Sequence, residues 1–437
     1  MIRSVETRRP LRRGAVALLA LAALLATPAP ATAADAGDGL WYFTQTGIAE
    51  AHQHTRGEGI TIAVLDGPIN AAVPELAGAN LTVREPAYCS RTAGGPPMDT
   101  QSTDADATHA TTIASLLLGS GAGAAGQAGV LGVAPGAQVL HYVVNFDGDR
   151  ARALACLHVG GADTGDIVAT AIDQAVADGA DIISLSFSAH ATDDLVDAIA
   201  DAQRAGVILV AAVPNGDFEP HNSILESANG VVAVERSDVN GRSATETFEP
   251  SPWITVAAPG QELRALVPPW ESYALTSGTS FATPYTAGVL ALAWSVYPDA
   301  TANQMIQSLI RNAGPDDQEP TRDAHLGYGI VSIERMLAHD PTAYPDENPL
   351  LRDDAEPSTA QILGEPAPGD DSTPAPLADT QDTASPGSSP GPLLLAAAGV
   401  LGLLVLAGIA LAIVLTLRAR RRSAQPASPP PTPGPWA

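Results

Sequence analysis

The chain has 437 residues, enough for about three domains of ordinary size, and its 22 basic and 48 acidic residues give a net charge of −26. This acidity argues against a nucleic-acid partner, because proteins that bind the phosphate backbone present a concentrated positive surface. With 45% apolar and only 16% charged residues the chain is too apolar to be disordered throughout, and its two cysteines exclude a disulfide-stapled miniprotein and a four-thiolate zinc site.

The N-terminus has the three parts of a secretory signal peptide. Four arginines within residues 8–13 precede an apolar run over residues 15–26, and Ala31-Thr32-Ala33 supplies a small-x-small cleavage site. A membrane-spanning helix is the alternative, but the run is shorter than the ~20 apolar residues that a span requires. We therefore expect a signal peptide over residues 1–33.

Residues 34–58 are interpreted as an N-terminal arm and residues 59–338 as one globular domain. The arm has 25 residues, too few to fold alone, so we expect it to pack against the domain. In the domain, short apolar runs alternate with helical patterns. The strand candidates are residues 60–65, 181–187 and 207–212, and the helix candidates are residues 110–118, 167–178, 193–205 and 285–297. This alternation predicts an α/β fold in which helices cover both faces of a parallel sheet.

The first strand candidate ends in a turn signal, Asp66-Gly67-Pro68. In parallel sheets, functional groups gather at the carboxyl ends of the strands. Asp66 is therefore a candidate functional residue.

Residues 339–391 have the composition of a linker. They are rich in Pro, Asp, Ser and Thr, and hold eleven acidic residues against one basic residue, Arg352. Such a segment buries too little apolar surface to offset its ordering entropy, and its like charges extend it. We expect a Pro-rich acidic stalk.

Residues 392–417 are predicted to form a transmembrane helix. Leu393 to Leu417 is a stretch of 25 residues without a charge, and four arginines follow within residues 418–422. Because basic residues stay on the cytoplasmic side, the tail over residues 418–437 should be cytoplasmic and the domain extracytoplasmic. A buried core helix is the alternative for the apolar stretch.

The two cysteines, Cys89 and Cys156, would meet oxidising conditions outside the cell. One disulfide bond between them would close a loop of about 67 residues and stabilise the fold by ~3–5 kcal/mol. Two free buried thiols are the alternative.

The most specific string in the domain is Gly278-Thr279-Ser280-Phe281-Ala282-Thr283-Pro284, which precedes a helical pattern. Its small residues allow a tight turn that puts the Ser280 hydroxyl at a helix N-terminus, where the dipole favours negative charge on an attacking oxygen. A lone serine at such a place is more often only a helix cap.

The string resembles the G-T-S-x-A-x-P nucleophile motif of the subtilisin-like serine proteases, the subtilases. Other segments resemble further motifs of that family in its chain order of Asp, His and Ser. These segments are residues 62–67, 131–137, 254–260 and 327–331. The resemblance covers nearly all of residues 59–336 and implies a subtilisin-like fold and serine endopeptidase activity.

The H-G-T-H-V-A motif of the family fits in two registers. In the first, His109 is the leading histidine; in the second, His109 is the trailing one and Asp106 takes the leading place. We prefer the first, which keeps Thr111 and the pair Ile113-Ala114 in step and replaces a glycine by Ala110, a modest change inside a helix. The second would imply an inactive enzyme, because a carboxyl with a pKa near ~3.9 cannot serve as the base at neutral pH.

The resemblance implies that His109 takes the Ser280 proton while Asp66 orients the imidazole. It also places Asn215, in Val210-Ala211-Ala212-Val213-Pro214-Asn215-Gly216, as the side-chain donor of the oxyanion hole. Pro214 stands where the family has glycine, and a plain Asn215-Gly216 turn is the alternative.

Three residues, Ser186, Phe187 and Ser188, lie in a segment similar to the strand that pairs with substrate in the family. An ordinary core strand is the alternative for their side chains. No dense Asp/Asn loop with the ligand spacing of a calcium site stands out, so neither metal nor cofactor is predicted.

The order of signal peptide, arm, subtilase domain, stalk, membrane helix and basic tail resembles the mycosins, membrane-anchored subtilases of type VII secretion systems. It implies an endopeptidase with protein or peptide substrates, attached to a secretion membrane complex. The alternative is a structural stabiliser of that complex with weak or dispensable proteolysis, for which the departures at Ala110, Pro214 and Ser188 speak. A third interpretation is a peptide-maturing subtilase of a natural-product pathway.

Overall fold

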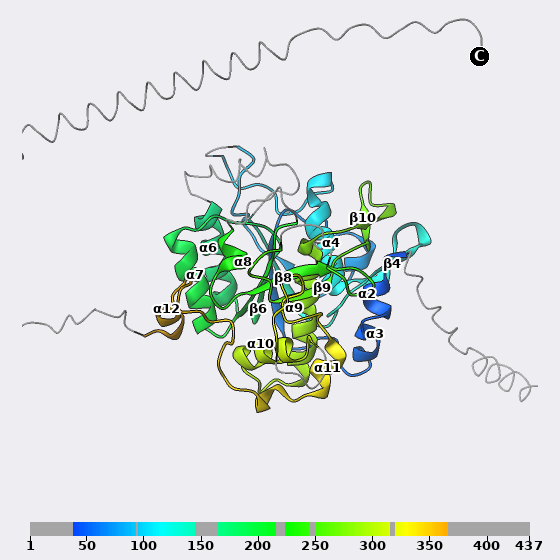
Figure 1. The fold of residues 1–437 in the computed structure, drawn as a ribbon. Helices are drawn as coiled ribbons and strands as arrows, with labels where there is room; N and C mark the ends of the chain where they lie inside the picture. Colours follow the sequence, from blue (N-terminus) through cyan, green and yellow to red (C-terminus); the bar gives the residue numbers. More distant parts are fainter. Residues whose placement is uncertain are drawn as a thin grey trace, which may run out of the picture. The chain divides into compact units, whose positions relative to one another are not determined.

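A parallel sheet of seven strands is the framework of the domain (Figure 1). The computed structural model describes residues 38–92, 95–144, 164–215, 223–243, 250–314 and 320–365. In it the strands lie in the order β2-β5-β1-β6-β7-β8-β9, and each neighbouring pair is parallel. Their bounds are β1 Thr61–Asp66, β2 Leu81–Val83, β5 Gln138–Val143, β6 Ile182–Leu185, β7 Ile208–Ala212, β8 Val232–Ser237 and β9 Val256–Pro259.

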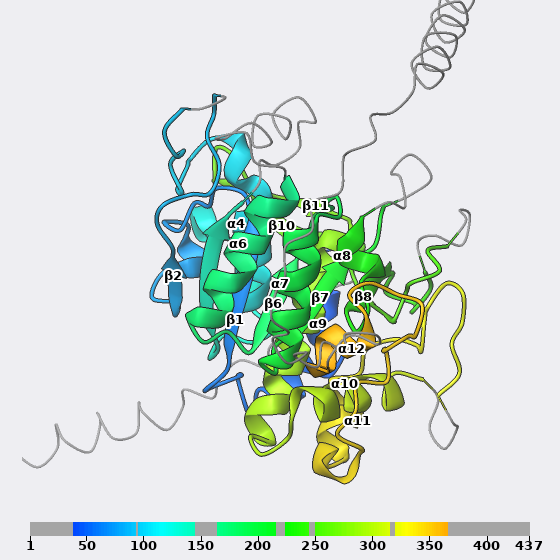
Figure 2. The same ribbon diagram turned by 90° about the vertical axis from the view of Figure 1, so that its left-hand side faces the viewer.

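Helices cover both faces of this sheet (Figure 2). One face carries α4 Thr108–Leu118, α9 Thr279–Val296, α10 Ala302–Arg311 and α11 Ile333–Ala338, and the other carries α6 Thr164–Ala177 and α7 Asp193–Arg204. Side chains of β1 alternate between the two cores: Ile62 and Val64 pack with α4 and α9, whereas Ala63 and Leu65 pack with α6 and α7. The predicted α/β fold is confirmed.

The strand order reverses direction at β1. The chain places β5 and β2 on one side of β1, and then β6 to β9 in succession on the other. The carboxyl ends at such a switch point form a crevice, because the neighbouring connections diverge to opposite faces. Asp66, the last residue of β1, lies at this crevice.

Two antiparallel hairpins were not predicted from the sequence. They pair β3 Ser120–Ala122 with β4 Ala128–Leu131, and β10 Leu263–Val267 with β11 Ser272–Thr276. The second hairpin is braced from both sides: the Trp270 indole N–H donates to the Thr103 carbonyl at 2.7 Å, and the Ala124 N–H donates to the Tyr273 hydroxyl at 3.0 Å.

The N-terminal arm packs along α9 through its short helices α2 Trp41–Thr44 and α3 Ile48–Ala51. Tyr42 is fully buried and donates to the Leu131 carbonyl at 2.5 Å. The Tyr285 hydroxyl of α9 donates to Thr46 at 2.8 Å, so both rings are tied to backbone or side-chain partners.

Residues 339–365, the first half of the expected linker, are folded against the domain, so the predicted boundary at residue 338 lies too early. We call this segment the strap. It contains a short 3-10 helix, Pro341–Ala343, and α12 Thr359–Leu363, whose Ile362 is buried. The Arg352 guanidinium stacks on the Trp253 ring, 4.3 Å from its centroid, and donates to the Ser227 carbonyl at 2.5 Å.

The strap runs along the amino ends of the strands. Asn229, just before β8, exchanges hydrogen bonds with the Arg352 backbone at 2.7 and 2.9 Å, and its own N–H donates to the Glu356 carbonyl at 2.8 Å. Arg204, just before β7, donates to the Gln361 carbonyl at 2.6 Å. The strap therefore lies at the amino ends of the strands, whereas Asp66 lies at the carboxyl end of β1.

Several predicted features fall outside the described residues: the signal peptide over residues 1–33, Cys156, the rest of the linker, the membrane helix over residues 392–417 and the tail. Within the part of the chain that the structure describes, no helix has the length and apolarity needed to cross a bilayer.

Candidate functional site

The buried Asp66 and the partly buried His109 form a pair at the switch point of the sheet. Asp66 ends β1 and His109 is the second residue of α4. The imidazole Nδ1 lies 3.0 Å from each carboxylate oxygen of Asp66, and the Gly67 N–H donates to the same carboxylate at 2.7 Å. Because Nδ1 faces an acceptor it carries the proton, which leaves Nε2 as the basic nitrogen.

The charge state of Asp66 follows from competing effects. Burial alone would raise its pKa, but the charge of His109 and the hydrogen bonds from His109 and Gly67 together outweigh burial, and the pKa of Asp66 lies below its ordinary value of 3.8. Asp66 is therefore a carboxylate at neutral pH, able to stabilise a positive charge on the imidazole.

Asp106, the alternative residue in the second register, is engaged elsewhere. Its carboxylate accepts from the Ser102 hydroxyl at 2.7 Å and from the Arg91 guanidinium at 2.8 Å, and it lies in the short 3-10 helix before α4. The structure thus brings the imidazole of His109, and not Asp106, to the Asp66 carboxylate. Ala110 is fully buried inside α4, where a helical backbone accepts its methyl group.

Ser280 is the second residue of α9 and faces a cleft of about 360 Å³ that His109, Asn215 and Phe281 also line. The helix is capped by Gly278, and no side-chain hydrogen bond caps it, so Ser280 is not a helix cap. The Phe281 ring lies 5.6 Å from the His109 ring, between centroids. Base and hydroxyl therefore share one partly enclosed space.

The backbone carbonyl of Ser280 has an unusual partner. In a regular helix it would accept from the N–H four residues later, but that residue is Pro284, which has none. The Ser186 hydroxyl donates to this carbonyl instead, at 2.9 Å. Ser186 therefore holds the start of α9 in place.

Asn215 lies beyond the carboxyl end of β7 and points at the start of α9. Its Oδ1 accepts from the Thr279 N–H at 2.9 Å and from the Arg236 guanidinium at 2.5 Å, whereas the Thr279 hydroxyl gives its one proton to the Val213 carbonyl at 2.7 Å. These donors commit the amide oxygen, so the remaining capacity of the amide is that of an N–H donor beside the cleft. An asparagine in an ordinary turn would not need these contacts with α9 and β8.

The three predicted substrate-binding residues behave differently from one another. Ser186 is buried and bonded to Ser280, Phe187 packs against the core under α6 and α7, and Ser188 is exposed. None of their side chains lines the cleft of Ser280. Pairing of this backbone with a substrate stays a prediction.

Sequence reasoning missed a second imidazole behind the pair. His141, on β5, is fully buried, and its Nε2 donates to the Gly67 carbonyl at 2.8 Å. Burial, the largest effect, lowers the pKa of His141, so the ring is neutral. The only signal in the sequence is a histidine within an otherwise apolar strand.

Cys89 is fully buried in a small cluster with Ala87, Met98 and Val143. Its predicted partner, Cys156, lies outside the described residues, so the disulfide bond stays a prediction.

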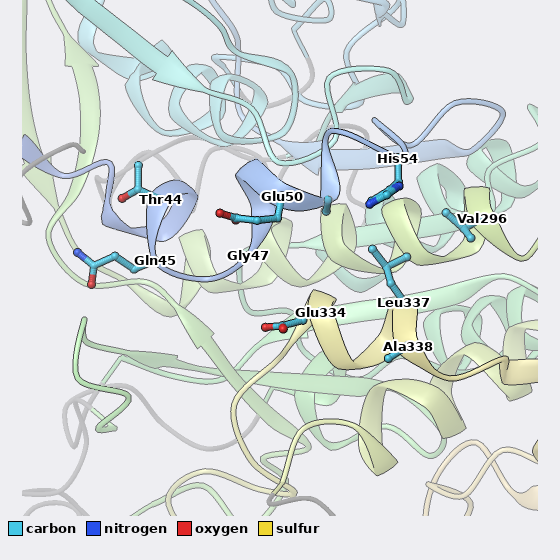
Figure 3. Close-up of a pocket in the computed structure, with 10 residues that line it drawn as sticks. Thr44, Gln45, Gly47, Glu50, His54, Val296, Glu334, Leu337 and Ala338 are labelled. Atoms are coloured by element: carbon cyan, nitrogen blue, oxygen red, sulfur yellow. The ribbon is translucent and has the colours of Figure 1, made fainter. Parts of the chain in front are cut away.

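A larger cavity, of about 730 Å³, opens between the arm and α11 (Figure 3). Glu50 and Glu334 line one part of it, and Val296 and Leu337 another. Val296 ends the helix that begins beside Ser280, about 24 Å away at 1.5 Å per residue. Asp66, His109, Asn215 and Ser280 do not line this cavity.

Comparisons with known proteins agree with this geometry. Residues 57–329 match the model of the subtilase family. The thermostable alkaline protease of Halalkalibacterium halodurans is 33% identical over 280 residues, which cover 62% of this chain and 67% of that protein. Mycosin-5 of Mycobacterium tuberculosis is 32% identical over 132 residues, which cover 27% of this chain and 22% of that protein.

Among solved structures, the prenylagaramide maturation protease PagA is similar, with a TM-score of 0.53 and 26% identity. The superposition covers 67% of this chain and 98% of that one.

Proposed function

The chain belongs to the subtilase family and is a subtilisin-like serine endopeptidase, and we propose that Ser280, His109 and Asp66 carry its chemistry outside the cytoplasm. One observation supports this assignment above all others. The Asp66 carboxylate lies 3.0 Å from Nδ1 of an imidazole that shares a cleft with the hydroxyl at the start of α9.

In the proposed mechanism, Nε2 of His109 takes the Ser280 hydroxyl proton as Oγ attacks the carbonyl carbon of a peptide bond. Asp66 stabilises the imidazolium that forms. The Asn215 amide and the N-terminus of α9 stabilise the negative oxygen of the tetrahedral intermediate. The imidazolium then returns its proton to the leaving amine, and water repeats these steps on the acyl-enzyme.

Labelling with a fluorophosphonate, a reagent for activated serines, tests this proposal. We expect the wild type to be labelled, Ser280→Ala to lose all label and His109→Ala to be labelled at least about 10³-fold more slowly. His54→Ala, an exposed histidine of the arm, is the matched control and should be labelled at the wild-type rate. Equal labelling of wild type and Ser280→Ala would contradict the assignment.

We also propose a finer role: a membrane-anchored mycosin associated with a type VII secretion complex. The similarity to Mycosin-5 and the apolar stretch over residues 393–417, followed by arginines, support it. Membrane fractions of cells that produce the full chain should retain the protein after washing at high pH. A chain lacking residues 392–437 should be released.

The alternative role is that of a structural stabiliser of the complex, with dispensable proteolysis. The replacement of family glycines by Ala110, Pro214 and Ser188 favours it. Secretion that survives Ser280→Ala but fails on deletion of the protein would identify this role.

The similarity to PagA supports a third candidate, maturation of a precursor peptide, and a precursor gene beside this one would favour it.

A further inference from the structure

Arg236, near the end of β8, reaches across to the predicted oxyanion donor. Its Nη1 donates to the Asn215 side-chain oxygen at 2.5 Å, and its Nη2 donates to the Asn215 backbone carbonyl at 3.4 Å. We propose that Arg236 is a positioning residue that holds the Asn215 amide with its nitrogen toward the oxyanion. This inference rests on the proposed function.

The backbone that leads to Asn215 has left the sheet. It follows the last residue of β7 by three positions, and the preceding Pro214 has no N–H to donate. The last sheet-like bond before it is from the Val213 N–H to the Val234 carbonyl, at 3.2 Å. The two bonds from Arg236 to the side-chain and backbone oxygens of Asn215 fix the residue relative to β8.

The contacts select one of the two orientations of the amide. With Oδ1 toward Arg236 and the Thr279 N–H, two donors meet the two lone pairs of one acceptor atom. A half-turn of the amide would place its NH₂ group against the guanidinium and the Thr279 N–H, which are donors without lone pairs. The charge-assisted bond from Arg236 makes the observed orientation the stable one, and it leaves Nδ2 as the donor beside Ser280.

Arg236 is itself held by close packing. A Cβ added at Gly260 would lie 2.6 Å from the Arg236 Cβ, so this glycine makes room for the arginine stem. The Gly260 carbonyl accepts from the Gly278 N–H at 2.8 Å, which ties the same place to the segment that carries Ser280. The buried Nε of Arg236 has no hydrogen-bond partner.

The guanidinium of Arg236 places a positive charge beside Asn215. Within the described ranges no carboxylate forms an ion pair with it, in contrast to Arg242, which pairs with Asp238 at 3.0 Å. A positive charge fixed behind Asn215 polarises the amide and favours the negative oxygen of the transition state more than the neutral carbonyl of the substrate. Its loss should therefore lower kcat and leave KM unchanged.

The test is a double-mutant cycle with a peptide substrate, in the full chain. Removing the oxyanion asparagine in subtilisin, a relative, costs about 10²–10³ in kcat, and we expect a similar loss for Asn215→Ala. Arg236→Gln should lower kcat about 10-fold or more with KM and the kcat pH profile unchanged, and Arg236→Lys should recover part of the loss. In the Asn215→Ala background Arg236→Gln should change kcat less than about 2-fold.

Arg242→Gln is the matched control, an exposed arginine in the turn after the same strand, and should keep the wild-type kcat. Equal losses from Arg236→Gln in both backgrounds, or a loss confined to thermal stability, would overturn the positioning role. A wild type that neither hydrolyses peptides nor reacts with the fluorophosphonate would instead overturn the proposed function on which it rests.

Discussion

At the scale of single residues, Ser280 depends on a hydrogen bond that replaces one lost to proline. Pro284 leaves the Ser280 carbonyl without its helical donor, and Ser186 supplies the substitute from the end of β6. This replacement bond connects the carboxyl end of β6 directly to the residue that carries the nucleophile. A helix without the proline would satisfy the same carbonyl within itself.

This arrangement predicts a coupled effect of two substitutions. Ser186→Ala should lower the free energy of unfolding by about 1–2 kcal/mol, because it leaves a part-buried carbonyl unpaired. In a Pro284→Ala background the same change should cost less, because residue 284 then offers an N–H to that carbonyl. Urea unfolding of the four proteins measures the coupling; an equal cost in both backgrounds would contradict it.

His141 predicts how stability depends on pH. Its pKa is lowered by burial from the ordinary 6.5, so below about pH 6.5 the unfolded chain takes up a proton that the folded chain refuses. The free energy of unfolding should therefore fall with decreasing pH, by up to about 1.4 kcal/mol per pH unit, until the folded pKa is reached. The half-buried His52, also with a lowered pKa, adds to this slope.

Thermal unfolding at a series of pH values from about 4 to about 8 tests this prediction. The melting temperature should fall less steeply with decreasing pH in His141→Gln than in the wild type. Asp66 does not interfere, because its lowered pKa places its own loss of stabilisation below pH 3.8. Parallel slopes in the two proteins would contradict the assignment to His141.

The sequence allowed some of these residues to be predicted and not others. Asp66, His109, Ser280 and Asn215 each sit in a motif whose local turn or helix start is visible in the chain. Arg236 and the role of Ser186 depend on contacts between segments 21 and 94 positions apart in the chain, which only the folded strand order determines.

At the scale of elements, α9 packs against the segment between β4 and β5 and against α4, and Gly288 lies where the three meet. A Cβ at Gly288 would lie 2.7 Å from the Val133 Cγ1 and 3.4 Å from the Leu117 Cδ2 of α4. The long, apolar helices were predictable from their hydrophobic periodicity. The close contact at Gly288 was not, because a glycine inside a helical pattern has no single structural meaning.

Gly288→Ala should destabilise the protein although alanine favours helices. The propensity gain is about 1 kcal/mol, whereas overpacking of a tight core costs about 1–3 kcal/mol. We expect a net loss in denaturant unfolding. Val133→Ala removes the nearest clashing atom, Cγ1, but keeps Cβ, which would still lie 2.9 Å from the new methyl group. In that background Gly288→Ala should therefore cost less than in the wild type; a loss of the same size there would exclude the clash as its cause.

At the scale of the whole domain, the strap shows where composition misleads. Residues 339–391 were predicted as one extended linker because the average over the segment is acidic and Pro-rich. The average composition does not reveal the few residues that bind the segment to the domain. Among them are Arg352, which stacks on Trp253, and the buried Ile362. The sheet, in contrast, was predictable because its strands and helices repeat a strong pattern.

Arg352→Ala should release the strap. It removes the ring contact and the bond to the Ser227 carbonyl, so we expect a loss of about 1–3 kcal/mol in the free energy of unfolding and faster proteolytic cleavage within residues 339–365. Asp353→Ala, at the exposed neighbouring position, is the control and should behave as the wild type. Unchanged cleavage of the arginine variant would mean that other contacts fasten the strap.

Any polypeptide that continues from Glu365 starts its path near Arg204, at the ends of the strands remote from Ser280. A pulling force transmitted through that continuation would load the strap and the roots of β7 and β8 first. Ser280 lies at the opposite ends of the strands, away from these contacts. In the membrane-anchored protein that we propose, tension on the anchor would therefore act first on the strap, at a distance from Ser280.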